Sequence, residues 1–290
     1  MLRLRHAGAK GKRQSGTVPS SNGSTRMTDL ALNDGRLMPQ LGLGTYQIPD
    51  SQVAAVVRVG LDLGFRLVDT AALYHNERGV GEGLAHDDVW LTTKLWHDQH
   101  GDAEAALDAS LALLGRDHVD LYLIHWPHPA GERYVEAWQA LVQLRDAGKA
   151  RSIGVSNFLP EHLDAIIDAT GVVPAVNQIE LHPTFQQREV QAYNRERGIV
   201  TQSWSPLGQG ETLRDERVVA IAERLDATPA QVLIAWHLAK GLAVIPKAGD
   251  LDHLASNWRA TEVRLSEEDV AAIDAMDDPV GRMGPDPREL

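Results

Sequence analysis

The segment VWLTTKLWHDQHGDAEAALDASLALLGRDHVDLYLIH, residues 89–125, contains two short apolar runs on either side of one helix-period segment. Val89–Thr93 and Val119–His125 are rich in β-branched and aliphatic residues, as buried strands are. Ala103–Leu114 repeats its apolar residues at the spacing of an α-helix. A strand, a helix and a second strand in this order predict two parallel strands joined by a crossover helix.

The same alternation continues on both sides of this segment. Six further strand candidates follow the pattern, namely Gln40–Leu43, Leu67–Asp69, Ser152–Val155, Ala175–Ile179, Val200–Ser203 and Leu242–Ile245. The main helix candidates between them are Ser51–Leu63, Tyr134–Ala147, Glu161–Ala169, Arg188–Arg197 and Pro229–Lys240. Eight strands that alternate with helices favour a closed barrel over an open doubly wound sheet. The sequence therefore predicts an α/β protein with the (β/α)8, or TIM-barrel, fold.

The two ends of the chain differ from this pattern. Asn33-Asp34-Gly35 is a turn sequence, so residues 27–35 predict a small hairpin before the first barrel strand. From Asp278 onward the chain is rich in Pro and Gly, and we expect it to end as a short loop. Residues 1–26 hold six basic residues and no acidic one. We expect a disordered basic extension there, followed by a single barrel domain at residues 27–290.

The composition argues against several kinds of function. The 290 residues include no cysteine, which excludes disulfides, thiolate nucleophiles and Cys-based metal sites within this sequence. That absence fits a cytoplasmic location. The formal net charge of −12 repels nucleic acid and anionic membranes, and no apolar run is long enough to span a bilayer. We therefore expect neither a nucleic acid nor a membrane as a partner.

Polar side chains end three successive strands of the predicted barrel. Asp69 ends the second strand, Tyr74 follows it by five residues, Lys94 ends the third strand and His125 ends the fourth. In a barrel these strand ends meet at one rim, where active sites form. A phenol has an ordinary pKa near 10, and a neighbouring ammonium lowers that pKa by stabilising the phenolate. These four groups together can protonate a carbonyl oxygen while a hydride, which only a cofactor can supply, reaches the carbon.

The cofactor is not expected to bind in the manner of a Rossmann fold. Gly42-x-Gly44 and Gly79-x-Gly81-x-Gly83 are only partial matches to the G-x-G-x-x-G fingerprint. We interpret the second group as packing or turn glycines.

Several longer motifs, in order, resemble the aldo-keto reductase family over almost all of residues 27–290. They are GFRLVDTAALY at 64–74, TTKLW at 92–96, DLYLIHWP at 120–127, IGVSNF at 153–158, NQIELHP at 177–183 and IPK at 245–247. Within the family the chain is most similar to bacterial reductases of the 2,5-diketo-D-gluconate reductase type. Trp204 with the segment 205–210, and the short tail with Gly284-Pro285-Asp286-Pro287, support that subgroup.

The resemblance implies a role for each matching residue. Tyr74 would be the general acid, tuned by Lys94 and Asp69, and His125 would orient the carbonyl of the substrate. The cofactor would be NADPH, with NADH also used. Its binding residues would be Ser156, Asn157 and Gln178 at the carboxamide, Trp204 on the nicotinamide ring, Ser205, Leu207 and Gly208 along the pyrophosphate, Lys247 and His253 at the 2′-phosphate, and Asn257 at the adenine. The substrate pocket would be lined by Tyr46, Trp96, His125 and Trp126. The resemblance also implies a monomer.

One departure from the family pattern bears on the cofactor. Relatives commonly have Ser after the Lys of the Ile-Pro-Lys motif and Arg six residues beyond that Lys. This chain has Ala248 and His253 there, with Asp250 between them. A phosphate favours fixed cations and hydroxyl donors, and a carboxylate repels it. We therefore expect a preference for NADPH that is weaker than usual, with real activity on NADH.

The expected function is the reduction of aldehyde or ketone carbonyls of small molecules to alcohols, with dicarbonyls, keto-sugars and aromatic aldehydes as candidate substrates. Three alternatives stay open. A Schiff-base barrel aldolase would use Lys94 as its nucleophile. A metal-dependent hydrolase would need acidic partners that His97-x-x-His100 and His125-x-x-His128 lack, so we expect no metal site. A non-catalytic NADP-binding subunit would keep the fold and lose the chemistry.

Overall fold

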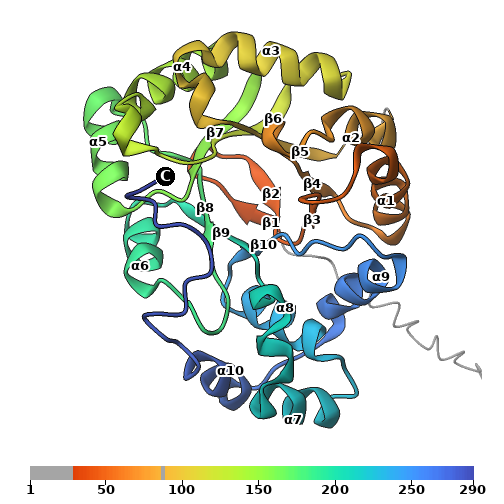
Figure 1. Cartoon of the computed structure of the whole chain (residues 1–290). Helices are drawn as coiled ribbons and strands as arrows, with labels where there is room; N and C mark the ends of the chain where they lie inside the picture. The colour runs from red at the N-terminus through yellow and green to blue at the C-terminus, as the bar shows by residue number, and fades with distance from the viewer. Residues whose placement is uncertain (1–28, 86–88) are drawn as a thin grey trace, which may run out of the picture.

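The computed structural model describes residues 29–85 and 89–290 (Figure 1). The predicted basic extension at residues 1–26 lies outside the described residues. None of the helices in the described part combines the length and the apolarity that crossing a bilayer requires.

Eight parallel strands form the centre of the molecule, in the order of their sequence. They are β3 (Leu43–Gly44), β4 (Leu67–Asp69), β5 (Trp90–Leu95), β6 (Val119–Ile124), β7 (Ala150–Ser156), β8 (Val176–Glu180), β9 (Val200–Trp204) and β10 (Ala243–Val244). Parallel bridges from Leu41 to Val244 and from Gly44 to Lys247 join the first strand to the last. The sheet is thus closed, and the predicted (β/α)8 barrel is confirmed. The first strand, Leu43–Gly44, is shorter than the predicted Gln40–Leu43. Leu41, which precedes it, forms only an isolated bridge to Val244 of the last strand.

Helices surround the barrel, as Figure 1 shows. The α-helices are α1 (Asp50–Leu63), α2 (Glu77–Leu84), α3 (Ala103–Leu114), α4 (Tyr134–Asp146), α5 (Pro160–Thr170), α6 (Arg188–Glu196), α7 (Glu216–Arg224), α8 (Pro229–Ala239), α9 (Leu251–Arg259) and α10 (Glu267–Asp274). Short 3₁₀ helices are η1 (Ala72–Tyr74), η2 (His97–Asp102), η3 (Pro129–Gly131), η4 (Gly208–Gly210), η5 (Thr212–Arg214) and η6 (Ala260–Glu262). The main core lies between the sheet and the helices, where Trp138 and Trp236 are fully buried.

The glycines of Gly79-x-Gly81-x-Gly83 were expected to precede or open a helix, and they lie inside helix α2, whose bounds were not predicted because glycines are poor helix formers. The structure shows why they are there. A Cβ atom on Gly79 would lie 2.3 Å from the carbonyl oxygen of Asp50, and one on Gly81 would lie 2.4 Å from that of Leu114. The glycines therefore let α2 pack directly on the backbone of its neighbours, as the interpretation of packing glycines requires.

A two-stranded hairpin covers the N-terminal end of the barrel. Its strands, β1 (Asp29–Ala31) and β2 (Leu37–Pro39), pair antiparallel. The predicted turn at Asn33–Gly35 is present, and the second strand lies beyond the predicted range of 27–35. Leu32 and Met38 of the hairpin are buried against residues of the barrel interior such as Leu67 and Leu121. The hairpin thus closes this end of the barrel.

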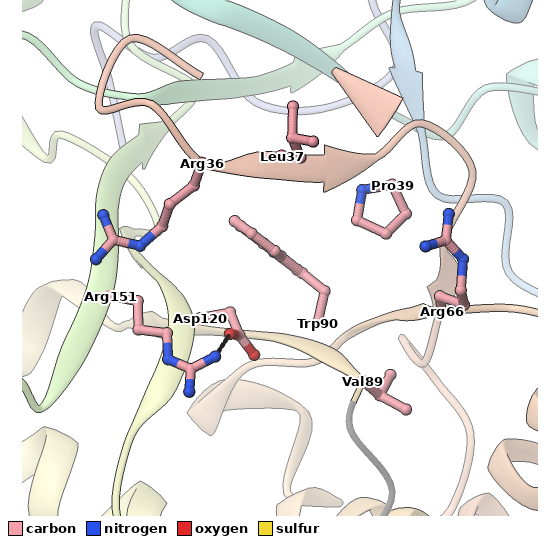
Figure 2. A pocket seen from close by; sticks show the side chains of 8 residues that line it. All are labelled: Arg36, Leu37, Pro39, Arg66, Val89, Trp90, Asp120 and Arg151. Atoms are coloured by element: carbon pink, nitrogen blue, oxygen red, sulfur yellow. Dashed lines mark hydrogen bonds and ion pairs between the residues drawn. The ribbon is translucent and has the colours of Figure 1, made fainter. Parts of the chain in front are cut away.

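A hollow of about 410 Å³ lies beside the hairpin (Figure 2). Its lining residues are Arg36, Leu37, Pro39, Arg66, Val89, Trp90, Asp120 and Arg151. Each arginine is paired with a carboxylate: Arg36 with Asp34 at 3.5 Å, Arg66 with Asp29 at 2.6 Å, and Arg151 with Asp120 at 3.0 Å. The hollow therefore carries balanced charge at the end of the barrel opposite the predicted active site.

Candidate active site

A pocket of about 370 Å³ opens at the C-terminal ends of the barrel strands. Twelve of the predicted site residues line it, namely Tyr46, Asp69, Tyr74, Trp96, His125, Trp126, Ser156, Asn157, Gln178, Trp204, Ser205 and Lys247. Lys94 lies beneath its floor and is fully buried. Four predicted cofactor residues, Leu207, Gly208, His253 and Asn257, are not among the lining residues.

Lys94 and Asp69 form a buried ion pair under the pocket. They come from the neighbouring parallel strands β5 and β4, and the Lys94 Nζ lies 2.6 Å from the Asp69 Oδ1. The same ammonium donates to the carbonyl oxygen of Thr70 at 2.8 Å, and the second carboxylate oxygen of Asp69 accepts from the Gln178 Nε2 at 2.8 Å. These extra hydrogen bonds offset the cost of burying two charges, so the pair holds a fixed position.

The phenol of Tyr74 lies directly above this pair. Its hydroxyl is 3.4 Å from the Lys94 Nζ, and that ammonium lies 4.9 Å from the centre of the phenol ring. Burial raises the pKa of Tyr74 well above its usual value, and the negative charge of Asp69 and the neighbouring Tyr46 raise it further. The lowering of this pKa that Lys94 was expected to cause is outweighed, because burial has the largest effect and the charge of Asp69 acts in the same direction as burial. Tyr74 therefore keeps its proton at neutral pH.

His125 follows β6 and faces Tyr74 from the other side. Its ring centre lies 5.7 Å from the ring centre of Tyr74 and 5.2 Å from that of Trp96, and both contacts are edge-on. Burial lowers the pKa of His125 well below 6.5, and the positive charge of Lys94 and the nearby His97 lower it further. The imidazole is thus neutral at neutral pH, and a neutral imidazole has one N–H to donate to a carbonyl oxygen.

Asn76 holds the loops that carry two of the pocket's tyrosines, and sequence reasoning missed it. Its buried Nδ2 donates to the carbonyl oxygens of Thr45 and Ile48, at 2.9 and 3.0 Å, on either side of Tyr46. Its Oδ1 accepts from the hydroxyl of Thr70 at 2.8 Å. The rings of Tyr46 and Tyr74 lie 5.0 Å apart as a result. A single asparagine two residues after Tyr74 gives no pattern that would have revealed this role.

Polar side chains gather beside the indole of Trp204 at the end of β9. The indole is partly exposed in the pocket, and its Nε1 donates to the Asn157 Oδ1 at 2.8 Å. The Asn157 Nδ2 donates to the carbonyl oxygen of His125 at 3.0 Å. Ser156 and Gln178 line the same wall. An open aromatic face with amide and hydroxyl groups beside it fits a flat aromatic carboxamide, as the nicotinamide of NADPH is.

The predicted 2′-phosphate site lies at the start of α9. Lys247 and His253 are exposed there, while Ala248 is buried and Asn257 is buried on the helix. The Asp250 carboxylate caps the helix by accepting from the backbone N–H groups of residues 252 and 253, at 2.9 and 3.1 Å. These hydrogen bonds hold the pKa of Asp250 below its usual range. A fixed negative charge therefore occupies a helix N-terminus, a position that otherwise favours phosphate.

The C-terminal strap, residues 278–290, runs along one side of the barrel mouth, from α10 past β8 toward α5, as the dark blue segment of Figure 1. Gly284, Pro285 and Leu290 form part of the pocket wall. The strap is the loop that the Pro- and Gly-rich sequence predicts. Its position over the pocket could not be inferred from that composition.

The histidines near the pocket do not form a recognisable metal site. His97 and His128 stack face to face, with ring centres 4.4 Å apart and planes 18° apart. Within residues 29–85 and 89–290, no group of three or more His, Asp or Glu side chains is arranged to hold a metal ion.

Comparison with known proteins gives a consistent family match. Residues 39–278 match the model of the Aldo/keto reductase family. An aldo-keto reductase of Mycolicibacterium smegmatis is 47% identical over 266 residues, which cover 89% of this chain and 96% of the relative. Methylglyoxal reductase DkgA of Escherichia coli is 45% identical over 270 residues, which cover 91% of this chain and 98% of the relative. The crystal structure of a Gox0644 mutant in complex with NADPH is 50% identical, with a TM-score of 0.89 over 91% of this chain and 98% of that chain.

Proposed function

The chain belongs to the aldo/keto reductase family, and we propose that it is an NADPH-dependent reductase of small, uncharged carbonyl compounds, with 2-oxoaldehydes such as methylglyoxal as its main substrate class. The observation that carries this proposal is the Tyr74 hydroxyl 3.4 Å from a buried ammonium, at the floor of an open pocket. The similarity to proteins named methylglyoxal reductase supports the substrate class.

The side chains of the pocket supply the acid chemistry of the reduction. NADPH, when bound against Trp204, supplies the hydride. Tyr74 donates its proton to the carbonyl oxygen, and the Lys94 ammonium stabilises the phenolate only as that proton leaves. Neutral His125 donates a hydrogen bond that orients the same oxygen. Asp69 keeps Lys94 charged and fixed, so that little rearrangement is needed during the proton transfer.

The walls of the pocket favour uncharged substrates. Tyr46, Trp96 and Trp126 provide aromatic surface, and the described lining residues include no arginine. A carboxylate on the substrate would lose water here without a guanidinium to pair with, which is costly. Lys94 does not offer such a partner, because it is buried and already bound to Asp69. Lys247, the other lysine at the pocket, is the residue proposed to bind the 2′-phosphate of the cofactor. The same burial of Lys94 disfavours a Schiff-base aldolase, since a charged, paired amine is a poor nucleophile.

The substrate class can be tested with a matched pair of three-carbon carbonyl compounds. Methylglyoxal and pyruvate both carry a 2-oxo group, and they differ in having an aldehyde or a carboxylate beside it. We expect kcat/KM with NADPH to be about 10²-fold or more higher for methylglyoxal, from the desolvation of the carboxylate. The absorbance of NADPH follows the reaction. Equal turnover of pyruvate would contradict the proposed class, and no turnover of any carbonyl would favour the non-catalytic NADP-binding subunit.

A second prediction concerns the choice of cofactor. Asp250→Asn keeps a capping oxygen for α9 and removes only the negative charge near the expected 2′-phosphate. We expect kcat/KM for NADPH to rise on the order of fivefold at low salt, as an unscreened charge a few ångströms from a phosphate implies, while the value for NADH stays the same. The gain should shrink as salt is added. Equal changes for NADPH and NADH would show that Asp250 acts on the helix rather than on the phosphate.

A further inference from the structure

We propose that Glu180 is a positioning residue that fixes the C-terminal strap over the pocket and, through the strap, fixes the indole of Trp204. This inference deepens the proposed reductase function and rests on it. Nothing in the catalytic arrangement described above requires Glu180, which is the last residue of β8 and is almost completely buried.

The carboxylate of Glu180 is bound mainly by the backbone of the strap. Its Oε1 accepts from the Met283 N–H at 2.7 Å and lies 3.0 Å from the His182 Nε2, and its Oε2 accepts from the Gly284 N–H at 2.9 Å. Burial raises the pKa of Glu180, but the hydrogen bonds from His182, Met283 and Gly284 outweigh burial and hold that pKa below its usual range. The group is therefore charged at neutral pH, and hydrogen bonds to a charged acceptor are strong.

The bond to Gly284 places the strap against the edge of Trp204. A Cβ atom on Gly284 would lie 2.7 Å from the Cη2 of Trp204 and 3.0 Å from the Glu180 Oε2. Only glycine allows both the hydrogen bond and this close approach. The Nε1 of the same indole donates to the Asn157 Oδ1 at 2.8 Å. Asn157 and Gly284 thus hold the nitrogen-bearing side of the indole at two points, and Glu180 controls the second of them.

The strap has a second anchor near its C-terminal end, beside the loops that follow β6 and β7. There the His128 N–H donates to the carbonyl oxygen of Leu290 at 2.9 Å, and Arg288 pairs with Glu161 at 2.9 Å. Both members of that ion pair are largely exposed, so it contributes little. Glu180 is therefore the anchor expected to dominate the position of the strap.

The start of the strap is held independently of Glu180. The N–H of Asp278 donates to the carbonyl oxygen of Thr184 at 3.2 Å, and the N–H of Gln186 donates to the carboxylate of Asp277 at 2.9 Å. Loss of the Glu180 charge should therefore release the segment around residues 282–287 without unfolding the barrel.

Glu180→Gln tests the proposal, because it keeps the size of the side chain and replaces one acceptor oxygen with a donor. One backbone N–H of the strap then faces the amide N–H of the glutamine instead of an acceptor oxygen. We therefore expect the KM for methylglyoxal and the Kd for NADPH each to rise about tenfold, as the loss of a charged hydrogen bond implies. The kcat should change by less than about threefold, since Glu180 acts on the strap, whereas Tyr74 and Lys94 are held by Asp69 and Thr70. The matched control Glu161→Gln, at the exposed anchor, should leave all three constants unchanged within about twofold.

Trypsin provides a readout that does not depend on turnover. It cleaves after Arg282 within the strap, and the cleavage rate follows the local opening of that segment. We expect Glu180→Gln to raise the rate about tenfold while Tm falls little. Gly284→Ala leaves Glu180 charged, but its Cβ crowds both Trp204 and the Glu180 Oε2, so it should weaken NADPH binding and add little to Glu180→Gln in the double variant.

Two results would overturn the positioning role. One is an unchanged trypsin rate and unchanged NADPH affinity in Glu180→Gln. The other is a parallel loss of kcat and Tm, which would mark Glu180 as a residue of general stability. If the wild-type enzyme reduced no carbonyl compound, the proposed function would fail, whereas the trypsin rate and the NADPH affinity would still decide the role of Glu180.

Discussion

Tyr74→Phe is expected to lower kcat by about 10²- to 10⁴-fold, the usual contribution of a general acid. The phenylalanine ring fills the same space, so the change removes only the hydroxyl that lies 3.4 Å from the Lys94 Nζ. The Kd for NADPH should stay within about twofold, because the hydroxyl acts on the transition state rather than on the bound cofactor. Steady-state kinetics with methylglyoxal and a fluorescence titration with NADPH measure the two quantities.

A neighbouring phenol provides the decisive comparison. The ring of Tyr46 lies 5.0 Å from that of Tyr74 in the same pocket, and it is more exposed. Tyr46→Phe should reduce kcat far less than Tyr74→Phe. Tyr134→Phe, on α4 and away from the pocket lining, should have no effect. If Tyr46→Phe proved the inactive variant, the proton would come from Tyr46 and the assignment would be wrong.

Lys94→Met is expected to damage both activity and stability. The change removes the ammonium beside the phenol, and we expect kcat to fall on the order of 10²- to 10³-fold through lost stabilisation of the phenolate. It also leaves the Asp69 carboxylate buried without its partner at 2.6 Å. An uncompensated buried charge should lower the free energy of unfolding by about 3–5 kcal/mol. Urea denaturation and steady-state kinetics measure the two effects.

The double variant Asp69→Asn, Lys94→Met separates these two effects. With both charges removed, most of the lost stability should return, because neither group is then left unpaired. The kcat should stay low, because the ammonium is still absent. A double variant as unstable as Lys94→Met would show that packing, rather than charge, accounts for the lost stability. Recovery of kcat would remove Lys94 from the mechanism.

The sequence predicted the features that follow from regular patterns. The period of two in strands and of 3.6 in helices located the barrel, and parallel strands place their polar ends at one rim. Asp69 and Lys94 could therefore be predicted from the sequence to lie together. The bounds of helix α2 could not be predicted, because the close contact of Gly81 with the backbone of Leu114 outweighs the low helix propensity of glycine.

The features that were missed depend on contacts between distant segments. Glu180 was visible as a polar residue at a strand end, but its partner Gly284 lies more than a hundred residues further along the chain. Likewise, the raised pKa of Tyr74 arises from burial first and then from the charge of Asp69, and burial cannot be deduced from residue types. Patterns predict elements and their order, whereas the electrostatics of a site depend on how tightly those elements pack.

The hairpin of β1 and β2 has a consequence for the order in which ligands bind. It seals one end of the barrel with Leu32 and Met38, and the interior behind them is filled with aliphatic side chains. Cofactor and substrate must therefore arrive and depart through the same opening. When two molecules share one entrance, the deeper of them arrives first and departs last, so the kinetic scheme should be ordered rather than random.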